Sequence, residues 1–312
     1  MESSGTQPYV VLNNGLKMPQ IGLGTFLSSS EELIPVVKAA ILDHGYRAID
    51  TASVYQNEEA IGEALQQCFA AGIKREDIFV TTKLWQEDRE DVEGALRASL
   101  KKLKLDYLDL YLVHWMAPKT DWEKSPNPFM NTPTHKVWAA MEHCVDLGLV
   151  KSLGVSNCTV PMLMDLLSYA KHKPVTNQVE LHPYLKQGPF VEFHKKLDIT
   201  VTAYAPLGAS AWQLKDEKLK DLNLFEEPVI KELAAKYEKT PAQIILNWHL
   251  HRGHIIIPKT ITLKRLGENF NVFDFKMTGE EYEKINGLDH HARFFNPITF
   301  KEYGWNYCPY FE

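Results

Sequence analysis

One pattern repeats eight times along the chain: a short apolar run followed by an amphipathic stretch. The apolar runs are residues 21–26, 47–51, 78–84, 108–115, 150–157, 176–183, 200–207 and 254–260. Most are rich in Ile, Val and Leu with little alternation, which is typical of strands buried on both faces. The predicted helices are residues 30–44, 58–71, 90–103, 134–147, 159–170, 188–197, 227–252 and 262–273. Alternating strands and helices pair in parallel, so eight units predict an α/β fold closed into a (β/α)8, or TIM, barrel.

Further segments complete the predicted barrel. Residues 9–19 read as an N-terminal β-hairpin around Asn14-Gly15, a dipeptide that favours tight turns. Two strand–helix loops are long, and a last helix precedes an aromatic tail. These segments are residues 116–133, 208–225, 278–288 and 290–312. No Gly/Ser-rich or Pro-rich linker divides the chain, so we expect a single domain over residues 1–312.

Composition excludes several classes of function. The net charge of −6 disfavours nucleic acid and anionic membranes as partners, because both attract basic surfaces. The sequence has no apolar run of about 18 residues and no signal-peptide pattern at its start, so we expect a cytoplasmic protein. Its four cysteines form no CxxC pair, and His249 and His251 do not share a helix face. We therefore expect no metal.

Polar side chains stand at the ends of three successive apolar strands. Asp50 ends the second strand and Tyr55 follows it, Lys83 lies near the end of the third, and His114 ends the fourth. In a (β/α)8 barrel these strand ends form the face that carries the reactive groups. A structural polar plug is the alternative explanation, but buried charged groups are costly unless they are paired. Four such residues together favour a site.

The chemistry of these four groups fits one reaction. A tyrosine hydroxyl has a pKa of about 10 and is a poor acid at neutral pH. A nearby lysine cation would stabilise the phenolate and lower that pKa, and an aspartate would hold the lysine in place. A histidine could hydrogen-bond the substrate oxygen or relay a proton. Together the groups would form a general acid, as carbonyl reduction requires.

Three long motifs resemble the signatures of the aldo-keto reductases. The first is GYRAIDTASVYQNEEAIG at 45–62, and the second runs from 141 to 157 and ends in GLVKSLGVSN. The third is IPKT at 257–260, followed by Arg265 and by Glu268-Asn269. The resemblance covers about residues 13–289 in the expected order, and the aldose, aldehyde and xylose reductases are the most similar members.

The resemblance implies roles for the four polar residues. Tyr55 is the implied proton donor, and Asp50, Lys83 and His114 complete a catalytic tetrad. The histidine also bears on the reaction, because steroid double-bond reductases of this family have glutamate at that position. His114 therefore indicates carbonyl reduction.

The resemblance also implies an NADPH site, although the chain has no Rossmann fingerprint. The Gly22-Leu23-Gly24 segment lacks the third glycine, and this family binds its dinucleotide extended across the barrel mouth. By the resemblance, residues 156, 157 and 178 hold the nicotinamide carboxamide, the ring of Tyr204 stacks on the nicotinamide, and residues 205–210 line the pyrophosphate. Residues 259, 260 and 265 bind the adenosine 2′-phosphate, and residues 268 and 269 lie at the adenine. The full set of implied cofactor residues is Gly24, Thr25, Asp50, Ser156, Asn157, Gln178, Tyr204, Ala205, Pro206, Leu207, Gly208, Ser210, Ile257, Lys259, Thr260, Ile261, Thr262, Arg265, Glu268 and Asn269. A lysine and an arginine beside a helix N-terminus form a good phosphate site, which favours NADPH over NADH. Without the rest of the motif, Arg265 would be interpreted as a surface cation.

The expected substrate pocket is apolar, which excludes water from the reaction. Its implied residues are Phe26, Val54, Tyr55, Trp85, His114 and Trp115. Phe26 stands where aldose reductases have tryptophan, which suggests a wider pocket on that side. The aromatic tail either packs along the barrel wall or closes the pocket through Phe295, Asn296 and Trp305.

We therefore expect a monomeric protein that uses NADPH to reduce small-molecule carbonyl substrates, aldehydes first, with ketones and aldoses left open. A nucleotide-binding regulatory or structural barrel without turnover is the main alternative, and the intact tetrad disfavours it. A third hypothesis is a metal-dependent hydrolase that uses Asp50 or Glu180. The absence of metal-ligand spacing in the sequence counts against it.

Overall fold

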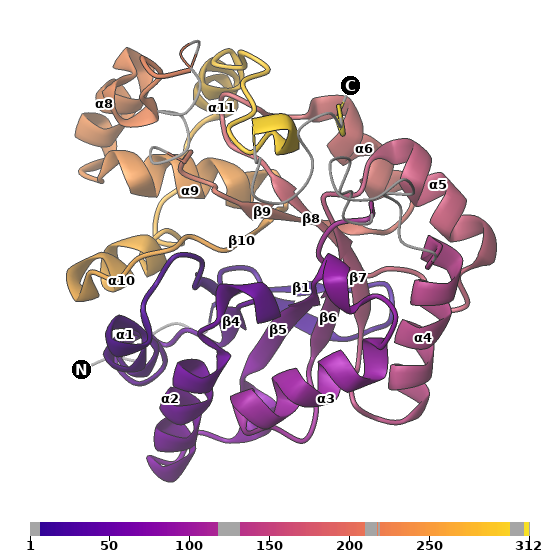
Figure 1. Ribbon diagram of the computed structural model, residues 1–312. Helices are drawn as coiled ribbons and strands as arrows, with labels where there is room; N and C mark the ends of the chain where they lie inside the picture. The colour runs from indigo at the N-terminus through magenta and orange to yellow at the C-terminus, as the bar shows by residue number, and fades with distance from the viewer. Residues whose placement is uncertain (1–6, 118–131, 210–216, 218, 300–308, 312) are drawn as a thin grey trace.

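The computed structural model describes residues 7–117, 132–209, 217, 219–299 and 309–311, and within them eight parallel strands form one sheet in the order of the chain (Figure 1). The strands are β3 (Leu23–Gly24), β4 (Ala48–Asp50), β5 (Phe79–Leu84), β6 (Leu110–Val113), β7 (Leu153–Ser156), β8 (Thr176–Glu180), β9 (Thr200–Tyr204) and β10 (Ile255–Ile256). Bridges from Ile21 to Ile256 and from Gly24 to Lys259 join the last strand to the first. At this seam a Cβ on Gly24 would lie 2.6 Å from the carbonyl oxygen of Ile257, so glycine is required. The (β/α)8 barrel is confirmed.

Helices lie around the outside of these strands (Figure 1). They are α1 (Ser30–Leu42), α2 (Glu58–Ala70), α3 (Val92–Leu103), α4 (Thr134–Asp146), α5 (Val160–Tyr169), α6 (Gly188–Lys196), α8 (Pro228–Tyr237), α9 (Pro241–His251), α10 (Leu263–Phe270) and α11 (Gly279–Asn286). Helix α3 begins where the Asp91 side chain accepts a hydrogen bond from the Gly94 N–H. It ends at Lys104, which adopts a left-handed conformation with φ of 55°. No helix in the described part of the chain is long and apolar enough to cross a membrane.

The prediction of one helix over 227–252 is wrong, because the structure divides this segment into α8 and α9. The chain turns at Glu238, whose φ is 53°. Thr240 then caps α9, with its side chain accepting from Gln243 N–H and the Gln243 side chain returning to the Thr240 backbone. Pro241 occupies the first helical position, which suits proline because its missing N–H would have no partner there.

The hairpin forms as predicted, but its turn is centred one residue earlier. Strands β1 (Tyr9–Val11) and β2 (Lys17–Pro19) pair antiparallel. The Gly15 N–H donates to the Leu12 carbonyl at 2.8 Å, so Asn13 and Asn14 form the centre of the turn. Gly15 follows with φ of 84°, the left-handed conformation that glycine favours. Leu12 and Met18 pack on inward-facing residues at the starts of the strands and thereby close the lower end of the barrel.

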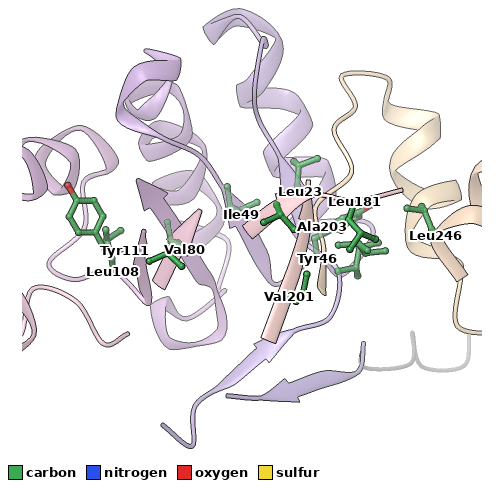
Figure 2. Close-up of a cluster of buried hydrophobic side chains, with 14 of the residues drawn as sticks. Leu23, Tyr46, Ile49, Val80, Leu108, Tyr111, Leu181, Val201, Ala203 and Leu246 are labelled. Atoms are coloured by element: carbon green, nitrogen blue, oxygen red, sulfur yellow. The ribbon is translucent and has the colours of Figure 1, made fainter. Parts of the chain in front are cut away.

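Successive side chains along the strands point alternately outward, into the apolar core beneath the helices, and inward, toward the interior of the barrel. Ile49, Val80 and Tyr111 point outward into the apolar layer beneath the helices (Figure 2). Their immediate neighbours point into the barrel, since successive side chains of a strand face opposite ways. At the carboxyl ends of the strands, this inward set supplies Asp50 and Lys83. The fold therefore presents these polar groups at the open end of a barrel whose other end is closed.

Candidate active site

A cavity of about 420 Å³ opens at the carboxyl ends of the strands. Its walls contain most of the residues expected from the sequence: Gly24, Thr25, Phe26, Asp50, Val54, Tyr55, Trp85, His114, Trp115, Ser156, Asn157, Gln178, Tyr204, Ala205, Pro206, Leu207, Gly208, Ile257 and Lys259. Ala209, inside the expected segment 205–210, also lines it, and so do Leu27 and Pro258, which we had not expected. Phe295 contributes a wall from the tail. The volume of this cavity is within the range of small-molecule sites.

Lys83 lies at the base of this cavity and is fully buried. Its Nζ is 2.5 Å from Oδ1 of Asp50, 2.8 Å from the carbonyl oxygen of Thr51 and 3.5 Å from the hydroxyl oxygen of Tyr55. Burial lowers the pKa of Lys83, and the neighbouring Asp50 carboxylate opposes that change. The ion pair therefore keeps a cation beside the tyrosine hydroxyl in a site that would otherwise disfavour it.

Asp50 is held from the opposite side of the barrel as well. Its Oδ2 accepts a hydrogen bond from the Gln178 side chain at 2.7 Å. Its carbonyl oxygen accepts from the Thr25 hydroxyl at 2.9 Å. Because each oxygen has a separate partner, the carboxylate cannot rotate without breaking a buried bond.

The loop that carries Tyr55 is fixed by its neighbours. Tyr55 ends a short 3-10 helix, and the Ser53 hydroxyl donates to the Lys83 carbonyl at 3.2 Å. The buried Asn57 side chain accepts from the Thr51 hydroxyl at 3.0 Å and donates to the Thr25 carbonyl at 2.9 Å. Asn57 and Thr51 were missed by reasoning from the sequence. Both are polar residues inside the first motif, which is the signal that could have identified them.

His114 lies on the other side of Tyr55. Its ring is 5.7 Å from the Tyr55 ring and 5.2 Å from that of Trp85, both approached edge-on. Burial, with a smaller contribution from the charge of Lys83, lowers the pKa of His114 well below 6.5. The imidazole is therefore neutral at physiological pH and can both donate and accept a hydrogen bond.

A second group of polar residues forms the wall opposite the tyrosine. The Tyr204 hydroxyl donates to Asn157 Oδ1 at 2.8 Å, and Asn157 Nδ2 donates to the His114 carbonyl at 3.1 Å. The Ser156 hydroxyl donates to the carbonyl of Gln178 at 2.8 Å. Burial raises the pKa of Tyr204 well above 10, so its hydroxyl stays protonated. These bonds hold the Tyr204 ring, which is half-buried, at the cavity surface.

The part of the expected cofactor site that would bind the adenosine 2′-phosphate extends from Lys259 to helix α10. Lys259 and Arg265 are exposed, and Arg265 lies in the first turn of that helix. The hydroxyl of Thr260 accepts from the Thr262 N–H at 3.0 Å just before the helix begins. The expected cofactor residues that do not line the cavity are Thr260, Ile261, Thr262, Arg265, Glu268 and Asn269. Lys83 and Asn296, which were expected in other roles, do not line it either. Ser210 and Trp305 lie outside the described residues.

The end of the chain returns to the site in a way the sequence did not indicate. The Tyr310 hydroxyl donates to the Asn157 carbonyl at 2.8 Å and accepts from the Met116 N–H at 3.2 Å. Its ring lies edge-on to Trp115 at 5.2 Å. No local signal predicts contacts between residues so distant along the chain.

With this geometry established, comparison with known proteins defines the class. The aldo/keto reductase family model matches residues 20–290, and the chain belongs to that family. Among curated proteins it is similar to aldo-keto reductase family 1 member A1-A of Danio rerio, with 44% identity over 94% of this chain and 93% of that protein. It is equally similar to member A1 of Homo sapiens, with 44% identity over 93% and 91% of the two chains.

Solved structures agree with this assignment. An aldose reductase from Schistosoma japonicum superposes with a TM-score of 0.86 at 38% identity, covering 97% of this chain and 98% of that one. An aldo-keto reductase from Bombyx mori, solved in complex with NADP, gives 0.85 at 36% identity, covering 96% and 98%.

Proposed function

We propose that this protein reduces aldehydes to alcohols with NADPH, and that Tyr55 supplies the proton. One observation carries the proposal: a buried lysine cation, held by Asp50, lies 3.5 Å from the hydroxyl oxygen of Tyr55 at the base of an apolar cavity. Membership in a family of reductases and the NADP complex of the Bombyx mori relative support it.

The residues present fit NADPH. The cavity continues from His114 past the Tyr204 ring to Lys259, as an extended dinucleotide requires. Ser156, Asn157, Gln178 and Tyr204 would hold its nicotinamide end. At the other end, Lys259 and Arg265 flank the N-terminus of α10, where a helix dipole and two cations favour a phosphate. When bound, NADPH supplies the hydride that reduces the carbonyl carbon.

The protein's own groups would handle the proton. The Tyr55 hydroxyl donates its proton to the carbonyl oxygen as negative charge develops there. The Lys83 cation stabilises the phenolate that remains, and Asp50 keeps that cation in position. The neutral His114 orients the carbonyl by donating a hydrogen bond to its oxygen. The rings around these groups exclude water and strengthen each interaction.

The described walls favour an uncharged, apolar substrate. Phe26, Val54, Trp85, Trp115 and Phe295 surround the space above the tyrosine. No lysine or arginine of the described wall lies among them, since Lys259 belongs to the cofactor end. An aldose would leave several hydroxyls against apolar rings without partners, and each would cost binding energy. We therefore propose aromatic and short aliphatic aldehydes as the preferred substrates.

A substrate panel tests the proposal. Oxidation of NADPH, and separately of NADH, is followed with benzaldehyde, propanal, xylose and glucuronate. The proposal expects turnover with NADPH and higher kcat/KM for the first two compounds. Preference for xylose or glucuronate would refute the substrate class. Tight NADPH binding without turnover on any compound would instead support a regulatory or structural protein.

A further inference from the structure

Glu180 ends strand β8, two residues beyond Gln178, and its side chain is fully buried. Both of its oxygens accept backbone hydrogen bonds from the C-terminal tail. Oε1 accepts from the Phe294 N–H at 2.7 Å, and Oε2 accepts from the Phe295 N–H at 2.8 Å. We call this arrangement the Glu180 clamp. His182 Nε2 also lies 2.9 Å from Oε1.

The clamp determines where two aromatic rings lie. The Phe295 ring lines the cavity, lies edge-on to Tyr204 at 5.3 Å and is 6.4 Å from the Phe26 ring. The Phe294 ring is buried and stacks on His182 at 4.7 Å. Because the two amide groups are consecutive, fixing both of them fixes the backbone that directs one ring into the cavity and the other into the core.

The clamp and the tail depend on each other. A buried carboxylate is costly unless hydrogen bonds replace its water, and the tail's two N–H groups supply that replacement. A tail placed elsewhere would leave Glu180 without these donors. The tail is therefore fixed on the cavity by a group inside the barrel.

The geometry points to Glu180 as a positioning residue for substrate specificity, which acts by holding Phe295 as a wall against the substrate. This inference rests on the proposed reductase function. It assigns Glu180 no contact with the reacting atoms. Aldehydes with an aromatic group large enough to reach Phe295 should depend on the clamp, whereas very small aldehydes should not.

The test compares Glu180→Gln with a matched control, Glu142→Gln. Glu180→Gln keeps the volume of the side chain, but its amide NH₂ would face one of the two tail N–H groups and could not accept a hydrogen bond from it. Glu142 is also buried and accepts two consecutive backbone bonds, from the Lys171 N–H at 2.7 Å and the His172 N–H at 2.9 Å. Those bonds join α4 to a loop that does not line the cavity. Both of these bonds end on Oε1, so a glutamine can keep them, whereas at Glu180 each oxygen accepts one bond and an amide must lose one. The control therefore removes a buried negative charge but keeps the backbone bonds and does not touch the tail.

Two readouts are expected to change with Glu180→Gln and not with Glu142→Gln. Amide hydrogen exchange of a peptide spanning Phe294 and Phe295 should speed up. The ratio of the KM for benzaldehyde to the KM for propanal should rise by about tenfold. A change of this size corresponds to the loss of one net buried hydrogen bond. The Kd of NADPH should stay within about threefold of the wild-type value, a small change on the same scale.

Each contrary result has a distinct meaning. Unchanged exchange in Glu180→Gln would overturn the clamp, and faster exchange with the same benzaldehyde-to-propanal ratio as the control would overturn its role in specificity. Phe295→Ala keeps the clamp and should reproduce the KM change alone, so an unaltered ratio there also refutes the inference, even if Glu180→Gln does not fold. A wild-type protein that reduces no aldehyde would refute the proposed function, and the exchange comparison would still decide the clamp.

Discussion

Replacing the buried Lys83–Asp50 pair should separate the stability of the protein from its turnover. Lys83→Met alone leaves the Asp50 carboxylate buried, with Gln178 as its side-chain partner at 2.7 Å. Removing one partner of a buried ion pair costs about 3–5 kcal/mol. Because the bond from Gln178 remains, we expect a loss near 3 kcal/mol, within that range. A domain with a total stability of roughly 5–15 kcal/mol should still fold.

The double variant Asp50→Asn, Lys83→Met should behave differently. It removes both charges, and replacing a buried ion pair with neutral groups of similar volume is often close to neutral. We therefore expect a free energy of unfolding within about 1 kcal/mol of the wild-type value. Turnover should still fall by about 100-fold or more, because the cation 3.5 Å from the Tyr55 hydroxyl is gone.

Urea unfolding followed by tryptophan fluorescence measures the stability, and NADPH oxidation with benzaldehyde measures kcat. Two results would refute the reasoning. A double variant with wild-type kcat would remove the lysine from the mechanism. A double variant as unstable as Lys83→Met would show that an uncompensated carboxylate is not what destabilises the single variant.

Three other substitutions test separate parts of the account. Tyr55→Phe should bind NADPH with unchanged Kd but lose most reduction, since only the proton donor is removed; wild-type kcat would exclude Tyr55 as the acid. Arg265→Ala should raise the Kd of NADPH by about tenfold and that of NADH far less, because the guanidinium would pair with the 2′-phosphate; equal changes in titrations would contradict this. Burial lowers the pKa of His249 from 6.5 to about 3, so the unfolded chain binds its proton first and stability falls as pH drops through that interval. In urea melts between about pH 4 and 6, His249→Gln should flatten this dependence by up to ~1.4 kcal/mol per pH unit, and an unchanged slope would oppose it.

Local pattern in the sequence predicted the barrel and the polar residues at the ends of its strands, whereas the cofactor and pocket residues were implied by the family resemblance. Apolar runs of the correct length predict buried strands, and a period of two then places Asp50 and Lys83 inside the barrel at its open end. The break between α8 and α9 was also present in the sequence, as Thr240 followed by Pro241 and Gln243. It was missed because apolar periodicity continues on both sides of the break.

The contacts of the tail could not be predicted in the same way. Glu180 and Phe295 are separated by 115 positions, and Tyr310 and Asn157 by 153. Such contacts depend on where the folded chain returns, which no local pattern encodes. An acidic residue in a buried strand, two positions after Gln178, did signal an unusual environment. The identity of its partners, two backbone N–H groups, could be learned from the structure alone.

The central claim is that the cavity transfers a hydride from NADPH to an aldehyde and a proton from the protein. The most direct measurement uses NADPH that carries deuterium at its transferable position, with benzaldehyde as substrate, and mass spectrometry of the alcohol formed. The account predicts one deuterium on the former carbonyl carbon for each NADPH oxidised. Alcohol without deuterium, or no alcohol from a protein that binds NADPH tightly, would contradict it.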